Sequence, residues 1–144
     1  MATSTVTEAM KALAIAQIRA LYPEPKIYDA PVKQGLKLPA FLVRILKVHQ
    51  VRGMTHQAER TFFFVITYFP YEDSEDAEAE CLNVLETIQN NFKYLQNQFH
   101  IHELEGEVVD ENLVVTFQVA ARVMDVLKLV QMKTLEGVDV GSKN

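Results

Sequence analysis

Apolar residues recur at intervals of three and four in two separate stretches of the chain. In the first stretch the apolar stripe consists of Met10, Leu13, Ala14, Ile18 and Leu21. This spacing predicts a helix that buries one face. Thr5 and Glu8 have the spacing of a capping box, so we expect the helix to begin at Thr5 and to end before Pro23.

The second helical stretch follows an acidic run. Ser74 is the expected N-cap, and the acidic residues after it suit the positive end of a helix dipole. We expect this helix to continue to about Tyr94. Its predicted buried face consists of Ala77, Cys81, Val84, Leu85, Ile88 and Phe92.

The segments between and after these helices have the alternation of β-strands. We expect a short strand at Lys26–Ala30 and a long strand at Ala40–Val51 that becomes polar toward its end. Thr61–Phe69 is rich in aromatic and β-branched residues, which predicts a central strand. A hairpin of Phe99–Val109 and Asn112–Met124 is expected to turn at residues 110–112.

The final segment, Val126–Leu135, alternates less cleanly, and we expect an edge strand there. The predicted fold class is therefore α+β, a largely antiparallel sheet with two helices packed on one face. We expect a single domain over residues 1–136, followed by a flexible C-terminal tail at 137–144.

Composition narrows the functional classes. The chain has 144 residues, 49% of them hydrophobic, and a net charge of −5, which argues against a dedicated phosphate-binding surface. Its single cysteine excludes a disulfide within one chain. No apolar run approaches the ~20 residues that span a bilayer, and the N-terminus lacks the layout of a signal peptide. We therefore expect a protein of the cytoplasm without membrane contact.

No group of residues predicts a catalytic or metal site. His100 and His102 would share one strand face, with Glu103 and Glu105 on the other, but a third metal ligand is missing nearby. Exposed strand histidines are the favoured interpretation. Cys81 lies on an apolar helix stripe, where a buried and inert thiol is usual. We expect no cofactor, no metal and no enzymatic activity.

The loop between the two long strands is the best candidate for contacts. It joins the polar ends of a long strand pair and carries a methionine at its tip. We therefore predict an interface that consists of Val51, Arg52, Gly53, Met54, Thr55, His56 and Gln57.

The stretch from Lys26 to Pro70 resembles the tail terminator (head–tail joining, tail completion) proteins of long-tailed bacteriophages and phage-like tail elements. The similarity is most specific at Ile27-Tyr28-Asp29, at Gln34-Gly35 followed by Pro39, and at Arg60-Thr61-Phe62 leading into Tyr68-Phe69-Pro70. The segment Gly106–Phe117 is similar to the corresponding strand pair of that family.

The resemblance implies a structural virion protein of the tail and neck, assembled in the host bacterial cytoplasm. Such proteins form a homo-hexameric ring on the head-proximal end of the tail tube, stop its polymerisation and provide the docking surface for the head. The implied partners are the tail tube protein, the head-completion or neck protein and, in contractile tails, the sheath. DNA would pass through the ring without sequence-specific binding.

Two alternatives remain open. One is another neck, adaptor or tube-like ring protein of the same particle, which would differ in copy number and position. The other is a small α+β enzyme or regulator, in which the histidines and acids would have to converge into a site. Loss of an activity on replacing His100 and His102 by alanine would favour that second alternative.

Overall fold

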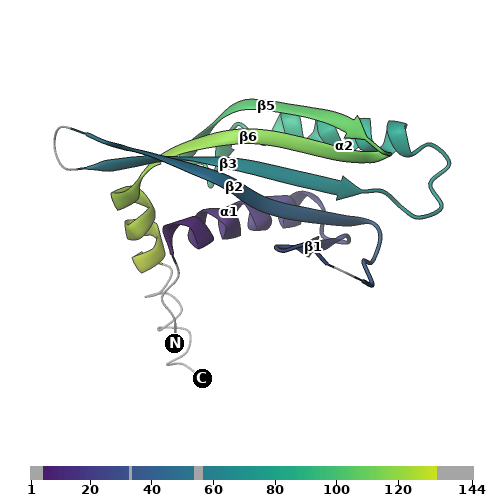
Figure 1. Ribbon diagram of the computed structural model, residues 1–144, viewed down its shortest axis with the longest axis horizontal. Coiled ribbons are helices and arrows are strands. Elements are labelled where there is room, and N and C mark those ends of the chain that lie inside the picture. Colours follow the sequence, from purple (N-terminus) through teal and green to yellow (C-terminus); the bar gives the residue numbers. More distant parts are fainter. Residues whose placement is uncertain (1–4, 33, 54–56, 133–144) are drawn as a thin grey trace, which may run out of the picture.

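The computed structural model describes residues 5–32, 34–53 and 57–132 (Figure 1). Within these residues the chain forms one six-stranded sheet and three helices. The labelled elements, in chain order, are α1 (Val6–Leu21), β1 (Lys26–Tyr28), β2 (Ala40–Arg52), β3 (Ala58–Phe69), α2 (Ala77–Asn91), β4 (Tyr94–Leu95), β5 (Phe99–Val109) and β6 (Asn112–Arg122). A further helix occupies residues 123–132.

The sheet has the strand order β1-β2-β3-β6-β5-β4. The α+β class is confirmed, but the prediction of a largely antiparallel sheet is wrong, because the sheet is mixed. Its three-residue strand β1 runs parallel to β2, with Lys26 opposite Ala40, whereas the other neighbouring pairs are antiparallel. A strand this short carries no sequence signal for the direction of its partner.

The predicted central strand and hairpin are confirmed. β3 lies between β2 and β6, and β5 and β6 join through Asp110 and Glu111. Both turn residues have positive φ, 50° and 65°, as a two-residue type I′ turn requires. That turn matches the right-handed twist of the strands that it connects.

The two predicted helices form, with corrected ends on the second. Thr5 and Glu8 make the predicted capping box at the start of α1. Asp76, not Ser74, is the N-cap of α2, and its carboxylate accepts a hydrogen bond from the Ala79 N–H at 3.1 Å. This helix ends at Asn91 rather than near Tyr94, because Tyr94 pairs with His100 in the sheet.

The prediction of an edge strand at Val126–Leu135 is wrong. Residues 123–132 are helical, β6 ends at Arg122 rather than Met124, and residues 133–135 lie outside the described part of the chain. Val126 is fully buried, and Leu129 and Val130 pack against the core. This three-to-four spacing is helical, and it buries an apolar face against the globule. The expected tail at 137–144 also lies outside the described residues.

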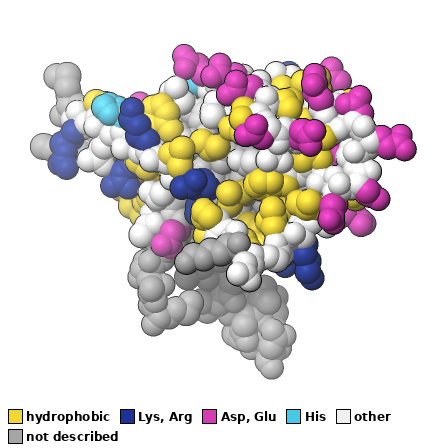
Figure 2. Space-filling model, turned by 45° about the vertical axis from the view of Figure 1, so that its right-hand side comes forward, with side chains coloured by type: hydrophobic (Ala, Val, Ile, Leu, Met, Phe, Trp, Pro, Cys, Tyr) yellow, Lys and Arg dark blue, Asp and Glu magenta, His cyan; other side chains and the backbone are white. Residues whose placement is uncertain are grey.

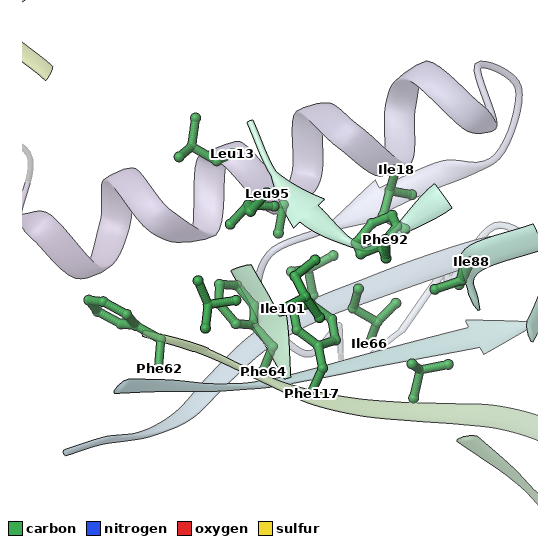
Figure 3. Close-up of a cluster of buried hydrophobic side chains, with 14 of the residues drawn as sticks. Leu13, Ile18, Phe62, Phe64, Ile66, Ile88, Phe92, Leu95, Ile101 and Phe117 are labelled. Atoms are coloured by element: carbon green, nitrogen blue, oxygen red, sulfur yellow. The ribbon is translucent and has the colours of Figure 1, made fainter. Parts of the chain in front are cut away.

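The hydrophobic core combines buried side chains from the sheet and from the helices (Figure 3). Alternate side chains of β3 enter it, and Phe64 stacks on Phe117 of β6 with 4.9 Å between ring centroids. α1 contributes Ile18 and α2 contributes Ile88, both fully buried in the same cluster. The side chains of β3 that alternate with these core residues therefore lie on the other face of the sheet.

Candidate interaction surfaces

The sheet has an open face, defined here by the side chains of β2, β3, β6 and β5 that alternate with the core residues. In β3 these are Phe63, Val65 and Thr67, which are half-buried although their neighbours Phe62 and Phe64 are buried. A hollow of about 390 Å³ on this face is lined in part by Leu46, Phe63 and Val65. Figure 2 shows hydrophobic side chains gathered in the middle of one face of the molecule, with acidic side chains along its upper and right margins.

Charge on the open face changes sign across the sheet. Arg44 of β2 is opposite Val65 of β3, Val65 is opposite Thr116 of β6, and Thr116 is opposite Glu105 of β5. This row therefore has a cation at one margin, neutral residues in the middle and a carboxylate at the other margin. Arg44 and Glu105 are both exposed.

The β2–β3 hairpin forms the second candidate surface, an arm that projects beyond the rest of the sheet (Figure 1). The seven residues Leu46–Arg52 are all exposed, and Val51 keeps 55% of its surface accessible. At the loop, the Gly53 N–H donates a hydrogen bond of 2.8 Å to the Gln57 carbonyl oxygen. Exposed apolar side chains on such an arm suit a contact with another molecule.

The structure places part of the predicted interface on this arm. Its described members are all exposed: Val51, Arg52, Gly53 and Gln57. The other predicted members lie outside the described residues: Met54, Thr55 and His56.

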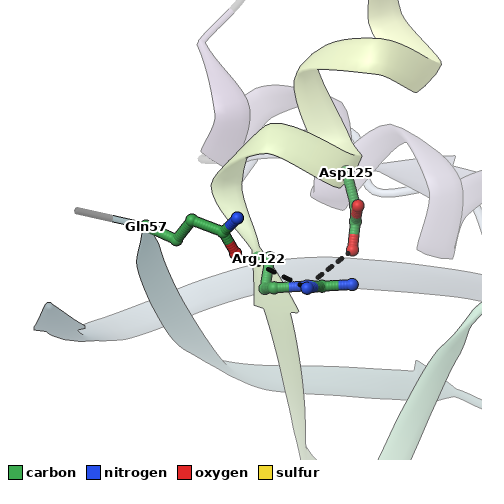
Figure 4. Close-up of polar contacts among 3 residues, drawn as sticks. All are labelled: Gln57, Arg122 and Asp125. Carbon is green, nitrogen blue, oxygen red and sulfur yellow. Dashed lines mark hydrogen bonds and ion pairs between the residues drawn. The ribbon is translucent and has the colours of Figure 1, made fainter. Parts of the chain in front are cut away.

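Arg122 links the arm to the helix at residues 123–132 (Figure 4). Its Nε lies 3.2 Å from Asp125 Oδ2, and its Nη1 donates a hydrogen bond of 3.5 Å to Gln57 Oε1. The sequence interpretation missed this residue. The available signal was an arginine at a strand end followed three residues later by an aspartate.

The two strand histidines lie together on the surface. His100 and His102 are exposed, and their ring nitrogens approach to 3.0 Å. The prediction that Glu103 and Glu105 face the other way is wrong, because a bulge between His102 and Glu105 turns both carboxylates to the exposed side. Among the described residues, no group of three potential ligands surrounds a metal position.

Cys81 is a buried residue of the core, as its position on the helix stripe predicted. Burial, and then the charge of neighbouring Glu80, raise the pKa of the Cys81 thiol. Its Sγ donates a weak hydrogen bond of 3.6 Å to the Glu111 carbonyl oxygen. A thiol of raised pKa in an apolar setting is a poor nucleophile.

Two acidic residues at the start of α2, Asp76 and Glu80, make structural contacts. The Glu80 carboxylate accepts a hydrogen bond from the Tyr68 hydroxyl at 2.6 Å and another from the Tyr71 N–H at 3.1 Å. Asp76 caps α2. These contacts give both acidic residues a role in positioning α2.

Within the described part of the chain, no helix combines the length and apolar character needed to cross a membrane.

Comparison with known proteins gives one family. Residues 9–128 match the family described as phage tail terminator protein, a family of structural components of phage tails. The search of curated proteins found no match. The matched range runs from α1 into the helix that follows β6 and includes every strand of the sheet. Because it covers most of the 144 residues, the chain belongs to the phage tail terminator protein family, as its resemblance indicated.

Proposed function

We propose that this protein forms a ring, with six subunits, that caps the head-proximal end of a phage or phage-like tail tube. The ring stops tube polymerisation and provides the docking surface for the head or neck, while DNA passes through it without sequence-specific binding. The observation that carries this proposal is the family match over residues 9–128. The role is structural, without catalysis, in a virion component that is assembled in the host bacterial cytoplasm.

The fold offers what a ring subunit needs. A ring of identical subunits closes through two different surfaces that contact each other head to tail. We infer that the helices cover one face of the sheet, which leaves the open face and the arm available for contacts. The proposed unit of assembly is the single domain of residues 1–136, and the predicted tail at 137–144 lies outside the described residues.

The arm is the proposed contact with other tail components. Its predicted interface, Val51–Gln57, would touch the tail tube protein or a neighbouring subunit. The upper surface of the ring would meet the head-completion or neck protein, and in a contractile tail the sheath would lie outside. The exposed apolar side chains Val48 and Val51, at 40% and 55% accessibility, support this assignment.

The direct test compares particles made with and without this protein by negative-stain electron microscopy. We expect overlong or headless tails in its absence and normal tails when it is supplied. Copy number in purified tails separates the alternatives, since a terminator contributes one ring and a tube-like protein contributes many. Normal tails without the protein, or labelling along the whole tube, would exclude the proposed function.

A second experiment tests the arm. Residues 53–57 are replaced by Asn-Gly, a two-residue turn that can close the antiparallel pair Arg52–Ala58. We expect a folded protein that no longer caps tails. The matched control changes the other hairpin turn to the same sequence, Asp110→Asn with Glu111→Gly, and should cap normally. Normal capping by the arm variant would exclude the arm from the contact.

A further inference from the structure

Two strands of the sheet have outer edges that are mostly unpaired. β1 pairs with β2 only at Ala40–Leu42, and β4 pairs with β5 only at Phe99 and His100. Among the described residues, the remainder of both outer edges has no strand beside it. Such edges expose N–H and C=O groups that can pair with another strand.

The two edges carry opposite charge on the open face. At the β2 edge the charged side chains are Arg44 and Lys47, and both are exposed. At the β5 edge they are three exposed carboxylates, Glu103, Glu105 and Glu107. The registers through β3 and β6 place Arg44, Lys47, Glu105 and Glu107 on the same face. Glu103 lies inside the β5 bulge, and its carboxylate accepts a hydrogen bond of 3.0 Å from Gln118 on that face.

These charges do not neutralise each other within one chain. The two strands are separated by β3 and β6, which is three strand spacings or about 14 Å. This separation exceeds the Debye length of about 8 Å at physiological ionic strength. In the described part of the chain the ion pair is Arg122–Asp125, and it involves neither edge.

The two edges are also irregular at the same level of the sheet. β2 has a bulge between Ile45 and Lys47, and β5 has one between His102 and Glu105. Both bulges flank the row in which Phe64 of β3 is opposite Phe117 of β6. A bulge bends its strand and increases the local twist, so both edges are bent at one height.

We propose that the β2 edge of one copy pairs with the β5 edge of the next copy, so that the sheet continues from subunit to subunit. Arg44 and Lys47 of one subunit then lie opposite Glu103, Glu105 and Glu107 of its neighbour. This inference rests on the proposed ring and names the surfaces that close it. The contact is heterologous, as ring closure requires.

Strand direction agrees with this pairing. Three successive antiparallel steps separate β2 from β5, so β5 runs opposite to β2. Rotation of a copy about an axis along the strands preserves strand directions. The neighbour's β2 therefore arrives antiparallel to β5, which is the pairing that dominates the rest of the sheet.

Charge also selects against the competing two-fold contacts. A β2–β2 pair would place Arg44 and Lys47 against the same cations, and a β5–β5 pair would oppose carboxylates. Like charges on directly opposite strand positions are destabilising. The β2 edge of one copy thus pairs with the β5 edge of a second copy, and the two-fold dimers through β2–β2 or β5–β5 pairs are disfavoured.

Complementary charge reversals test the proposal in tail assembly. One variant carries Arg44→Glu with Lys47→Glu, and the other carries Glu105→Lys with Glu107→Lys. Each is added to a lysate that lacks the wild-type protein, alone and as an equimolar mixture, and capped tails of normal length are counted. The control Glu72→Lys with Glu86→Lys changes the net charge by the same amount and sign as Glu105→Lys with Glu107→Lys, at exposed positions away from both edges.

Each reversal alone should reduce capped tails by at least about tenfold, because it opposes like charges across the contact. The mixture should restore capping to within about twofold, since alternating variants then oppose unlike charges at every contact. Thermal unfolding confirms that each variant is folded. Normal capping by either variant alone, or no recovery in the mixture, overturns the pairing. Failure of the wild-type protein to cap tails would instead overturn the proposed function.

Discussion

The Tyr68 hydroxyl donates a hydrogen bond of 2.6 Å to the Glu80 carboxylate. This contact joins the central strand β3 to the first turn of α2 through two residues that are 12 positions apart in the sequence. Tyr68 is buried, with 4% of its surface accessible, and its ring lies 4.8 Å from that of Phe41. The phenol therefore contributes to the core through its ring and to the placement of α2 through its oxygen.

Replacing Tyr68 by phenylalanine should lower the free energy of unfolding by about 1.5–3 kcal/mol, because it removes one hydrogen bond to a charged group and keeps the ring. Urea denaturation measures the change. The control is Tyr71→Phe, since the contact of Tyr71 with Glu80 uses its backbone N–H and its side chain is exposed. Equal stability of the two variants would contradict a stabilising role for the Tyr68 hydroxyl.

The raised pKa of Tyr68 predicts that the folded protein loses stability at alkaline pH. Burial, followed by the hydrogen bond and charge of Glu80, raises the pKa of Tyr68 far above its usual value. An unfolded tyrosine ionises near pH 10, whereas folded Tyr68 stays protonated. The stabilisation that protonated Tyr68 gives the folded state is therefore complete below about pH 10. It is lost as the pH rises toward the pKa of Tyr68 in the folded protein. The slope of stability against pH above 10 should be smaller in Tyr68→Phe, and identical slopes would contradict the assignment.

Local signals in the sequence were enough to predict several features of the fold. The capping box of Thr5 and Glu8 and the turn at Asp110 and Glu111 each depend on residues within one short segment. The burial of Cys81 follows from its place on an apolar stripe. These features need no knowledge of distant contacts, which is why periodicity and turn chemistry predict them.

Other features depend on contacts between distant segments. The helix at 123–132 has a short apolar stripe that becomes decisive only when Val126 is buried in the core. The parallel direction of β1 depends on how residues 29–39 return the chain to β2. The row from Arg44 to Glu105 depends on three strand registers, so the opposite charges of the two edges were not visible in the sequence.

Gly106 allows α2 to approach β5 closely. A Cβ atom at this position would lie 2.5 Å from Leu85 Cδ1. Gly106→Ala should cost about 1 kcal/mol, because the end of the leucine side chain can move, and Gly106→Val about 2–3 kcal/mol. In a double-mutant cycle measured by urea denaturation, Leu85→Ala should reduce the cost of Gly106→Val. Additive effects would show that the two sites do not contact each other.

Cys81 should be protected from thiol reagents in the folded protein. It is the sole cysteine of the chain, so the labelling signal has one source. Its raised pKa and its burial leave little accessible thiolate, and reaction should be at least about a hundredfold slower than in urea because it requires local opening. A Cys81→Ala protein with Leu82→Cys is the control, because Leu82 is 49% exposed. Equal rates for the two positions would contradict burial of Cys81.

Arg122 should restrain the arm without contributing much to global stability. Its side chain is 58% exposed, so Arg122→Ala should change the free energy of unfolding by less than about 1 kcal/mol. Loss of its contacts with Gln57 and Asp125 frees the loop end of the arm from the helix at residues 123–132. Hydrogen exchange of the Gly53 amide, which bonds to Gln57, should therefore become faster, while the Phe64 amide in the core keeps its rate. Asp125→Asn retains a side chain that can accept the hydrogen bond and should have a smaller effect. Unchanged exchange at Gly53 in Arg122→Ala would show that the arm is held by its own strand pairing alone.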